Sequence, residues 1–303
     1  MQITFLGTGA AIPTAQRSAS AIAIRRKNEI ILFDCGEATQ RQMVQGGVGF
    51  HRTTKIFVTH MHGDHVLGLP GLLQTMSLLG RKKGLQIFGP KGIKDFVESI
   101  NQNVPYTLTF PLEIFEVAAG LVCNEKEYQV TAIDSGHMDP AFCYALTEKL
   151  RPGRFNTKKA QKLGVPKGPL WSELQSGKSV TLADGTVVQP QMVVGASRKG
   201  RKIVYTGDAG PSEALVTFAK NAELLIHEST FEDALQERAL KDKHSTPTMA
   251  AQTAKQANVK KLILTHISAR YQDANQLLEQ AKKTFPNTIL AQDFLKIELH
   301  LKD

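Results

Sequence analysis

The fold of this chain is decided by the stretch Lys55-Ile56-Phe57-Val58-Thr59-His60-Met61-His62-Gly63-Asp64-His65, in which an apolar, β-prone run leads directly into four potential metal ligands. His60 and His62 can point the same way as the predicted strand ends, because alternate residues of a strand share a face. Asp64 and His65 follow where the chain turns, so the hexapeptide could hold one metal ion on each side. The chain has nine histidines in 303 residues, so three within six positions indicate a metal site and not a chance cluster. Imidazoles with a carboxylate suit zinc best, and manganese or iron would also accept this donor set.

Length and composition limit the class of protein. A chain of 303 residues with an apolar fraction of 42% can form one large α/β domain or two small ones. No run is long enough to span a membrane, and a strand-like segment at residues 3–6 leaves no room for a signal peptide. Three cysteines without CxxC spacing (Cys35, Cys123 and Cys143) predict free thiols in a reducing compartment, so we expect a cytoplasmic protein.

The positive charge is concentrated in one segment. Residues 149–202 hold 12 Lys and Arg against two acids, Glu173 and Asp184, a local balance of +10. The whole chain is +9, so the remainder sums to −1. Basic segments are often only solvated surface, but charge focused in this way favours binding of a polyanion such as a nucleic acid.

Apolar runs that predict strands alternate with amphipathic runs that predict helices. The predicted strands are 3–6, 21–24, 30–33, 56–59, 86–88, 128–133, 142–146, 203–206, 224–226, 262–265 and 295–299. The predicted helices are 37–45, 66–79, 93–103, 212–220, 247–257 and 274–284. This alternation predicts a layered α/β domain.

The segment from about 150 to 192 breaks the alternation. It is rich in Pro, Gly and Lys, and Ala183-Asp184-Gly185 predicts a hairpin turn between residues 180–182 and 187–188. This composition gives the segment little to bury, so we expect a protruding arm and not a core element.

Two metal ions need more ligands than the hexapeptide supplies. His137, Asp208 and His266 each follow a predicted strand, at the edge where open α/β sheets gather their site residues. A single histidine after a strand is usually structural. Together with the hexapeptide, however, these three residues would complete two coordination shells.

At this point the chain resembles the metallo-β-lactamase superfamily and, within it, the ribonuclease Z family of tRNA 3′-end-processing endonucleases. The resemblance covers essentially the whole chain and rests on Leu6-Gly7-Thr8-Gly9, Phe33-Asp34-Cys35-Gly36-Glu37, the hexapeptide, His137, Thr206-Gly207-Asp208, His227-Glu228-Ser229-Thr230, His244-Ser245-Thr246 and His266-Ile267-Ser268-Ala269-Arg270. The hexapeptide specifies only the superfamily, whereas the motifs at 227–230 and 244–246, with the basic arm, narrow it to ribonuclease Z. The resemblance implies an α/β fold, a four-layer αββα sandwich with a protruding basic arm. One catalytic domain would span residues 1–303, with a flexible tRNA-binding arm inserted at 150–192.

The resemblance also implies two zinc ions per chain that share one carboxylate. The first would be held by His60, His62, His137 and Asp208. The second would be held by Asp64, His65, Asp208 and His266. Asp34 would orient a ligand imidazole, although a buried Asp that caps a turn is the alternative reading.

The implied reaction removes the 3′ trailer from precursor tRNA and leaves a 3′-hydroxyl. A water shared by the ions would lose a proton and attack phosphorus in line, with Asp64 as general base. His244, held by Glu228, would protonate the leaving 3′-oxygen. His244 also precedes a predicted helix start at Ser245-Thr246-Pro247, and both interpretations can hold together.

Substrate contacts are implied on both sides of the metals. Ser268 and Arg270 would bind the phosphate next to the scissile bond, and Arg17 belongs to a loop associated with reading the tRNA 3′ end. In the arm, the implied tRNA-binding residues are Lys158, Lys159, Lys162 and Lys167.

The loop with Arg17 departs from the family pattern Pro-x-Lys-x-Arg-Asn. Ala15 replaces the Lys and Ser18 replaces the Asn, which leaves discrimination against CCA-containing precursors open. The family implies a homodimer. We interpret His227 as structural and expect His51 and His300 to face solvent.

Two other functions stay open from the residues. A small-molecule phosphodiesterase would share the metals but would not need the basic arm. A non-catalytic RNA-binding protein with a degenerate metal site would need the arm but not the ligands.

Overall fold

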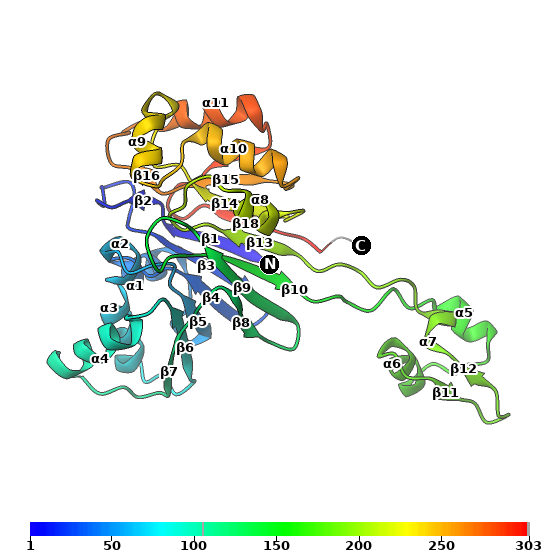
Figure 1. Ribbon diagram of the computed structural model, residues 1–303. Coiled ribbons are helices and arrows are strands. Elements are labelled where there is room, and N and C mark those ends of the chain that lie inside the picture. The colour runs from blue at the N-terminus through cyan, green and yellow to red at the C-terminus, as the bar shows by residue number, and fades with distance from the viewer. Residues whose placement is uncertain (105, 302–303) are drawn as a thin grey trace. The chain divides into compact units, whose positions relative to one another are not determined.

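The computed structural model describes residues 1–104 and 106–301, which contain two large β-sheets (Figure 1). The first sheet has the strand order β18 (Lys296–Glu298), β1 (Gln2–Gly7), β3 (Ala21–Arg26), β4 (Glu29–Phe33), β5 (Thr53–Phe57), β6 (Leu85–Gly89) and β7 (Leu112–Glu116). The second has the order β17 (Thr288–Leu290), β15 (Leu262–Thr265), β14 (Leu224–Glu228), β13 (Lys202–Tyr205), β10 (Phe142–Glu148), β9 (Tyr128–Asp134) and β8 (Gly120–Asn124). Both are mixed: β4 to β7 and β13 to β17 pair in parallel, whereas β18, β1, β3 and β4 pair antiparallel.

Helices cover the outer face of each sheet (Figure 1). The first sheet is covered by α1 (Thr39–Gly46), α3 (Leu69–Leu78) and α4 (Ile93–Asn103), whose apolar residues share a core with one face of the strands. The second is covered by α8 (Glu213–Ala219), α10 (Pro247–Gln256) and α11 (Asn275–Thr284). The other faces of both sheets meet in a core that includes Phe33, Phe57 and Tyr144. The predicted four-layer αββα sandwich is therefore confirmed.

Every predicted strand and helix corresponds to an element of the structure, with ends that differ by a few residues. Within the two large sheets, three strands, β7, β8 and β17, were not predicted. All three lie at the edges of their sheets, and much of β7 and β8 is exposed. Charged residues alternate with apolar ones in β7, and β17 is only three residues long, which weakens the strand signal of both.

The remaining elements are short. They are β2 (Gly9–Ala10), which pairs in parallel with β16 (Ile267–Ser268), the helices α2 (Gly63–Val66) and α9 (Gln236–Lys241), and the 3₁₀ turns η1 (Phe50–Arg52) and η2 (Asp233–Leu235). All three cysteines are buried free thiols, as predicted. Within the described part of the chain, every helix is too short or too polar to cross a membrane.

The chain divides into two compact units. The first combines Met1–Leu146 with Lys202–His300, and the second is built on Thr147–Arg201, compared with the 150–192 expected for the arm. Residues 302 and 303 of the expected 1–303 domain lie outside the described residues. The second unit contains α5 (Thr157–Lys162), α6 (Pro169–Gln175), β11 (Val180–Thr181), β12 (Val187–Val188) and α7 (Pro190–Val193).

The prediction that this segment has little to bury is wrong. Its helices and hairpin enclose a small apolar core of their own, made of Ala160, Val165, Leu174, Val180, Val188 and Val193. This core was not evident from the sequence, because its apolar residues are dispersed along a segment rich in Pro, Gly and Lys. They come together only when three short helices pack on the hairpin. The hairpin itself is confirmed, with Val180 opposite Val188.

Glu148 and Arg201, near the two ends of the second unit's sequence, form a buried ion pair. Arg201 donates from Nε and Nη2 to the two carboxylate oxygens of Glu148, at 2.8 and 2.7 Å, and the backbones of the two residues are also hydrogen-bonded. Because Glu148 neutralises Arg201, this arginine adds nothing to the charge that the unit can present to a polyanion. Apart from this pair, residues 147–201 hold ten Lys and Arg against two acids.

Candidate metal centre

The chain leaves the first sheet just before the histidine hexapeptide. Strand β5 ends at Phe57. Two residues later, the Thr59 N–H donates a hydrogen bond to the carboxylate of Asp34 at 2.7 Å. The hexapeptide then runs into α2. On the second sheet, His137 follows β9, Asp208 follows β13 and His266 follows β15, as predicted. Parallel neighbours end at the same edge of a sheet, so Asp208 and His266 are brought together by topology.

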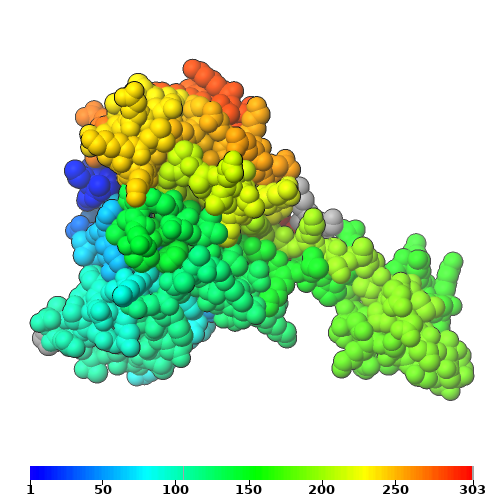
Figure 2. All heavy atoms as spheres, in the orientation of Figure 1, coloured from blue at the N-terminus to red at the C-terminus, as the bar shows by residue number. Residues whose placement is uncertain are grey.

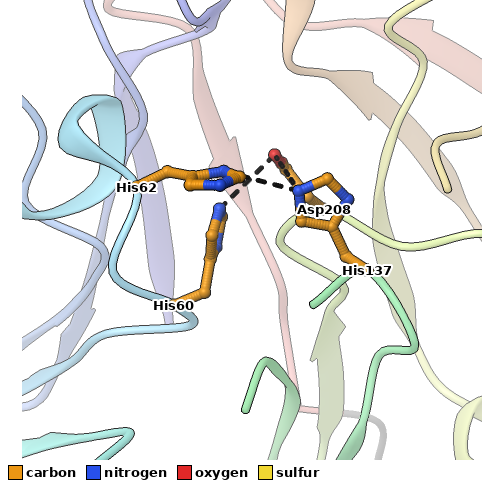
Figure 3. A group of neighbouring side chains, drawn as sticks. All are labelled: His60, His62, His137 and Asp208. Atoms are coloured by element: carbon orange, nitrogen blue, oxygen red, sulfur yellow. Dashed lines mark hydrogen bonds and ion pairs between the residues drawn. The ribbon is translucent and has the colours of Figure 1, made fainter. Parts of the chain in front are cut away.

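Four of these side chains converge in Figure 3, and their ligand atoms lie within 4.8 Å of one another. They are His60, His62, His137 and Asp208, called here the first group. His60 Nε2 and His137 Nε2 lie 3.6 and 3.8 Å from Asp208 Oδ2, and His137 Nε2 lies 3.4 Å from His62 Nδ1. The arrangement brings three nitrogens and one carboxylate oxygen to a common centre.

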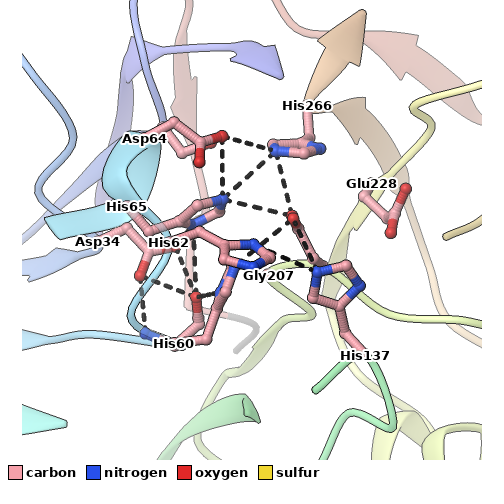
Figure 4. A network of polar contacts seen from close by, with 12 residues as sticks. Asp34, His60, His62, Asp64, His65, His137, Gly207, Glu228 and His266 are labelled. Atoms are coloured by element: carbon pink, nitrogen blue, oxygen red, sulfur yellow. Dashed lines mark hydrogen bonds and ion pairs between the residues drawn. The ribbon is translucent and has the colours of Figure 1, made fainter. Parts of the chain in front are cut away.

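A second group, Asp64, His65 and His266, lies next to the first (Figure 4). Asp64 Oδ2 is 3.5 Å from His65 Nε2 and 3.3 Å from His266 Nε2. The other oxygen of Asp208 faces this group, with Oδ1 3.4 Å from His65 Nε2 and 3.2 Å from His266 Nε2. Asp208 therefore lies between the two groups and presents one oxygen to each.

The donor set fits divalent metal ions. Within the described residues, His60 Nε2 and Asp208 Oδ1 are buried without a hydrogen-bond partner, which is costly unless something else satisfies them. Burial, reinforced by the neighbouring His65, lowers the pKa of His60 to about 2, so its imidazole is neutral and has a free lone pair. Burial opposes the ionised form of Asp208, but His266 and His65 outweigh burial and lower its pKa well below the usual range. Neutral imidazoles and an ionised carboxylate are the forms that bind metal.

Asp34 holds one of these imidazoles, as predicted. Its buried carboxylate accepts hydrogen bonds from His65 Nδ1 and from the hydroxyl of Tyr205, both at 2.7 Å. Sequence reasoning missed Tyr205 and the role of Thr59, whose hydroxyl lies 3.0 Å from both Asp34 oxygens. Neither residue carries a motif signal. Tyr205 reaches Asp34 because the two sheets face each other, and Thr59 reaches it because β4 and β5 are parallel neighbours in the first sheet.

Glu228 and His244 form a pair beside both groups. His244 Nδ1 lies 2.8 Å from Glu228 Oε1, and the His244 ring centroid is 4.6 Å from that of His137. Burial would lower the pKa of His244, but the charge of Glu228 outweighs burial and raises it to about 9. The predicted helix start is also present, because Thr246 caps α10. His244 lies close enough to Asp208 and His266 to form a third candidate group, which the sequence did not reveal.

The N-terminal loop contacts the second group through its backbone. Ala11 N–H donates to Asp64 Oδ2 at 2.8 Å, a contact with no sequence signal, since Ala11 contributes only its main chain. Arg17 of the same loop donates to Thr8 Oγ1 and to the carbonyl of Ala291, both at 2.7 Å. In this structure Arg17 therefore anchors the loop to the protein.

The remaining predicted residues divide between the rim and the second unit. Arg270 donates to Ser268 Oγ at 3.0 Å and lies over the ring of Phe231. The side chains of Lys158, Lys159, Lys162 and Lys167 are all exposed. His227 is buried, whereas His51 and His300 are exposed, as predicted.

One further contact joins loops from distant parts of the sequence. On the face seen in Figure 2, the green segment that carries His137 adjoins the yellow segment that leads to His244. His137 Nδ1 lies 3.2 Å from the carbonyl oxygen of Lys243, so the backbone of this segment orients the ring. An imidazole that donates from Nδ1 keeps its Nε2 lone pair for the first group.

The chain is similar to known proteins over its whole length. It is 46% identical over 300 residues to ribonuclease Z of Methanosarcina acetivorans, which covers 99% of this chain and 98% of that protein. The crystal structure of the short form of human tRNase Z (ELAC1) matches with a TM-score of 0.73 and 32% identity, covering 99% of this chain and 100% of that one. The metallo-β-lactamase fold protein YhfI of Bacillus subtilis, with a TM-score of 0.68, 20% identity and 98% of each chain covered, shares the fold. A family model described as Anti-Pycsar protein Apyc1 matches residues 1–104.

The paired sheets and the cluster of histidines and aspartates at their edge thus define a hydrolase of the metallo-β-lactamase fold, with a centre able to bind metal. The match to Apyc1 includes the hexapeptide but not His137, Asp208 or His266. The full-length similarity is more specific. The chain belongs to the ribonuclease Z family, and it is an endoribonuclease, a phosphodiesterase that cleaves within RNA.

Proposed function

We propose that this enzyme removes the 3′ trailer from precursor tRNA and leaves a 3′-hydroxyl on the tRNA. The observation that carries the proposal is the position of Asp208 between two ligand groups, with the Glu228–His244 pair beside them. This combination supplies both a site for two cations and a proton donor, which the hydrolysis of an RNA phosphodiester with a poor leaving group requires. The tRNA 3′-processing role is proposed by similarity to the ribonuclease Z relatives.

The two groups would hold two zinc ions, the first on His60, His62, His137 and Asp208, and the second on Asp64, His65, Asp208 and His266. When bound, the ions would lower the pKa of a water molecule and neutralise charge on the phosphoryl oxygens. Manganese or iron would suit the same donors less specifically.

Asp64 would act as the general base. Burial favours its neutral form, but the contacts with His266 and His65 outweigh burial and hold the pKa of Asp64 well below its usual range, so the carboxylate is ionised. Ala11 N–H fixes its orientation from the side of the N-terminal loop. An ionised, oriented carboxylate can accept the hydrogen bond of an attacking water molecule.

His244 would protonate the leaving 3′-oxygen. Its Nδ1 donates to Glu228, so the proton that can be transferred is on Nε2. Glu228 is itself held by Ala209 N–H at 2.8 Å and by the Thr230 hydroxyl at 2.6 Å, which prevents the carboxylate from rotating away. Without this donor the 3′-oxygen would leave as an alkoxide.

The tRNA substrate would be bound at two places. At the rim, Arg270 and Ser268 would bind the phosphate next to the scissile bond. In the second unit, a hollow between α5 and α7 is lined by Arg154, Lys158 and Lys159, and we propose it as a docking point for the tRNA backbone.

Metal analysis gives the first test. We expect purified protein to bind about two zinc ions per chain. Asp64→Ala should bind about one, because it removes a ligand from the second group only. Metal content by mass spectrometry of the dialysed protein measures both. A wild-type protein that takes up no zinc would contradict the proposed centre.

A pH profile tests the proton donor. Because the pKa of His244 is raised to about 9, the imidazole is protonated at neutral pH, and the rate should fall as pH rises through that region. Bound cations oppose a protonated imidazole, so we expect the alkaline limb at or somewhat below pH 9. Glu228→Gln removes the charge that raises this pKa, so its limb should move to lower pH. Single-turnover cleavage of precursor tRNA between pH 6 and 9.5 measures the shift, and identical limbs would argue against the assignment.

The N-terminal loop that contains Arg17 would influence how the tRNA 3′ end is recognised. Ala15 and Ser18 depart from the family pattern, and Arg17 is engaged with Thr8. Mapping the products from precursors with and without an encoded CCA would show whether this loop still rejects CCA.

We also propose a homodimer, in which one subunit's arm could hold the tRNA processed by the other, on the strength of the family resemblance. Light scattering of the purified enzyme measures its mass in solution. Three buried free cysteines are consistent with a cytoplasmic location.

A further inference from the structure

Two threonines occupy matching positions on opposite sides of the metal centre. Thr59 follows β5 of the first sheet, and Thr230 follows β14 of the second. Each donates to one carboxylate through both its backbone N–H and its hydroxyl. For Thr59 the acceptor is Asp34, at 2.7 and 3.0 Å, and for Thr230 it is Glu228, at 3.3 and 2.6 Å.

Each threonine hydroxyl also makes its shortest imidazole contact with a ligand of one metal group, and a longer contact of 3.4 Å with a second imidazole, His65 for Thr59 and His244 for Thr230. Thr59 Oγ1 lies 3.0 Å from His60 Nδ1, and Thr230 Oγ1 lies 2.9 Å from His266 Nδ1. A hydroxyl has one proton, and an ionised carboxylate has none to give. Since the proton of each hydroxyl goes to its carboxylate, the hydroxyl must accept from the imidazole, which therefore carries its proton on Nδ1.

This assignment determines which nitrogen faces the metals. With the proton on Nδ1, the lone pair of His60 is on Nε2, which points to Asp208 at 3.6 Å. The lone pair of His266 is likewise on Nε2, which points to Asp64 and Asp208 at 3.3 and 3.2 Å. His266 also has a left-handed backbone, with φ 56, so a regular strand does not set the direction of its ring.

We propose that Thr59 and Thr230 are positioning residues that fix the tautomer of one imidazole in each metal group, Thr59 for the first and Thr230 for the second. The proposal rests on the two-metal centre proposed above and adds residues that no ligand motif contains. Groups that orient metal ligands in this way typically contribute about 10–100-fold to metal affinity or activity.

The topology explains why the threonines lie there. Ser229 N–H donates to the Thr265 carbonyl at 2.9 Å, which extends the parallel pairing of β14 and β15 by one residue. Thr230 is therefore carried alongside His266. Asp34 and Thr59 are likewise adjacent because β4 and β5 are parallel neighbours.

The test compares Thr→Val, which keeps the shape and removes the hydroxyl, with Thr→Ser, which keeps the hydroxyl. Zinc affinity is measured by competition with a chromophoric chelator in two backgrounds that each retain one group. In Asp64→Ala, which retains the first group, Thr59→Val should weaken zinc binding about 10–100-fold and Thr230→Val should have little effect. In His62→Ala, which retains the second group, Thr230→Val should weaken zinc binding about 10–100-fold. Thr59→Val should weaken it less there, because Thr59 reaches the second group only through Asp34 and a longer contact of 3.4 Å with His65 Nδ1.

Thr59→Ser and Thr230→Ser should recover most of the affinity. Ser229→Ala is the matched control, because Ser229 is buried beside Thr230 and its Oγ has no hydrogen-bond partner within the described residues. Unchanged affinity in both valine variants would overturn the proposal, and so would serine variants as weak as the valine ones. A parent protein that binds no zinc at all would instead contradict the metal centre.

Discussion

Replacing His244 with alanine is expected to slow cleavage of precursor tRNA by roughly 10²–10⁴-fold, the usual contribution of a positioned general acid. The imidazole is held by Glu228 at 2.8 Å, its pKa is raised to about 9, and it therefore carries a proton at neutral pH. A ribose 3′-oxygen is a poor leaving group without that proton. Single-turnover rates at saturating enzyme separate this step from binding and product release.

The substrate itself provides the control for His244. A nitrophenolate is stable without protonation, so His244→Ala should hydrolyse bis(p-nitrophenyl) phosphate at nearly the wild-type rate. Zinc content should also be unchanged, and His51→Ala, at an exposed histidine, should behave as wild type. Because His244 forms a candidate group with Asp208 and His266, loss of zinc in His244→Ala would make it a ligand, and an unchanged cleavage rate would remove it from the mechanism.

Removing the second unit is expected to lower kcat/KM for precursor tRNA by about 10³-fold at 0.15 M salt. This figure assumes that four phosphate contacts are lost, one for each of Lys158, Lys159, Lys162 and Lys167, with a salt slope near 0.9 per contact and affinity compared with that at about 1 M salt. Arg151 and Arg198 form an isolated antiparallel bridge, so residues 152–197 can be replaced by an Asn-Gly turn. This deletion leaves the Glu148–Arg201 pair intact.

The deletion should spare hydrolysis of bis(p-nitrophenyl) phosphate, because no residue of the two metal groups lies between 147 and 201. A variant with Lys158, Lys159, Lys162 and Lys167 replaced by alanine keeps the apolar core of the unit and should reduce the salt slope by about four. Unimpaired tRNA cleavage by the deletion variant would show that the unit does not bind the substrate.

Much of the fold could be predicted because its signals are local. A buried strand shows as a short apolar run, and a helix start as a cap such as Ser245-Thr246-Pro247, so the central strands and the six longer helices were found. Among the edge strands, β18 was found but β7, β8 and β17 were missed, two of them with a signal weakened by alternating charges or by shortness. The core of the second unit was missed because it forms between residues as far apart as Ala160 and Val193.

By itself, the sequence determined a layered α/β class and which histidines and aspartates follow strand ends, because both depend on spacing along one segment, whereas the αββα sandwich was implied by the family resemblance. Only the tertiary structure decided how those residues meet. In the folded protein, Asp208 lies between the two groups, and the Ala11 N–H donates to Asp64. Arg17 donates to Thr8. Thr59 and Thr230 each contact a metal-group imidazole, on opposite sheets. Several of these contacts join residues that are distant in sequence, such as Ala11 and Asp64 or Thr230 and His266, and they use backbone atoms or common hydroxyls. No residue type marks such contacts in advance, because they form only when the chain has folded.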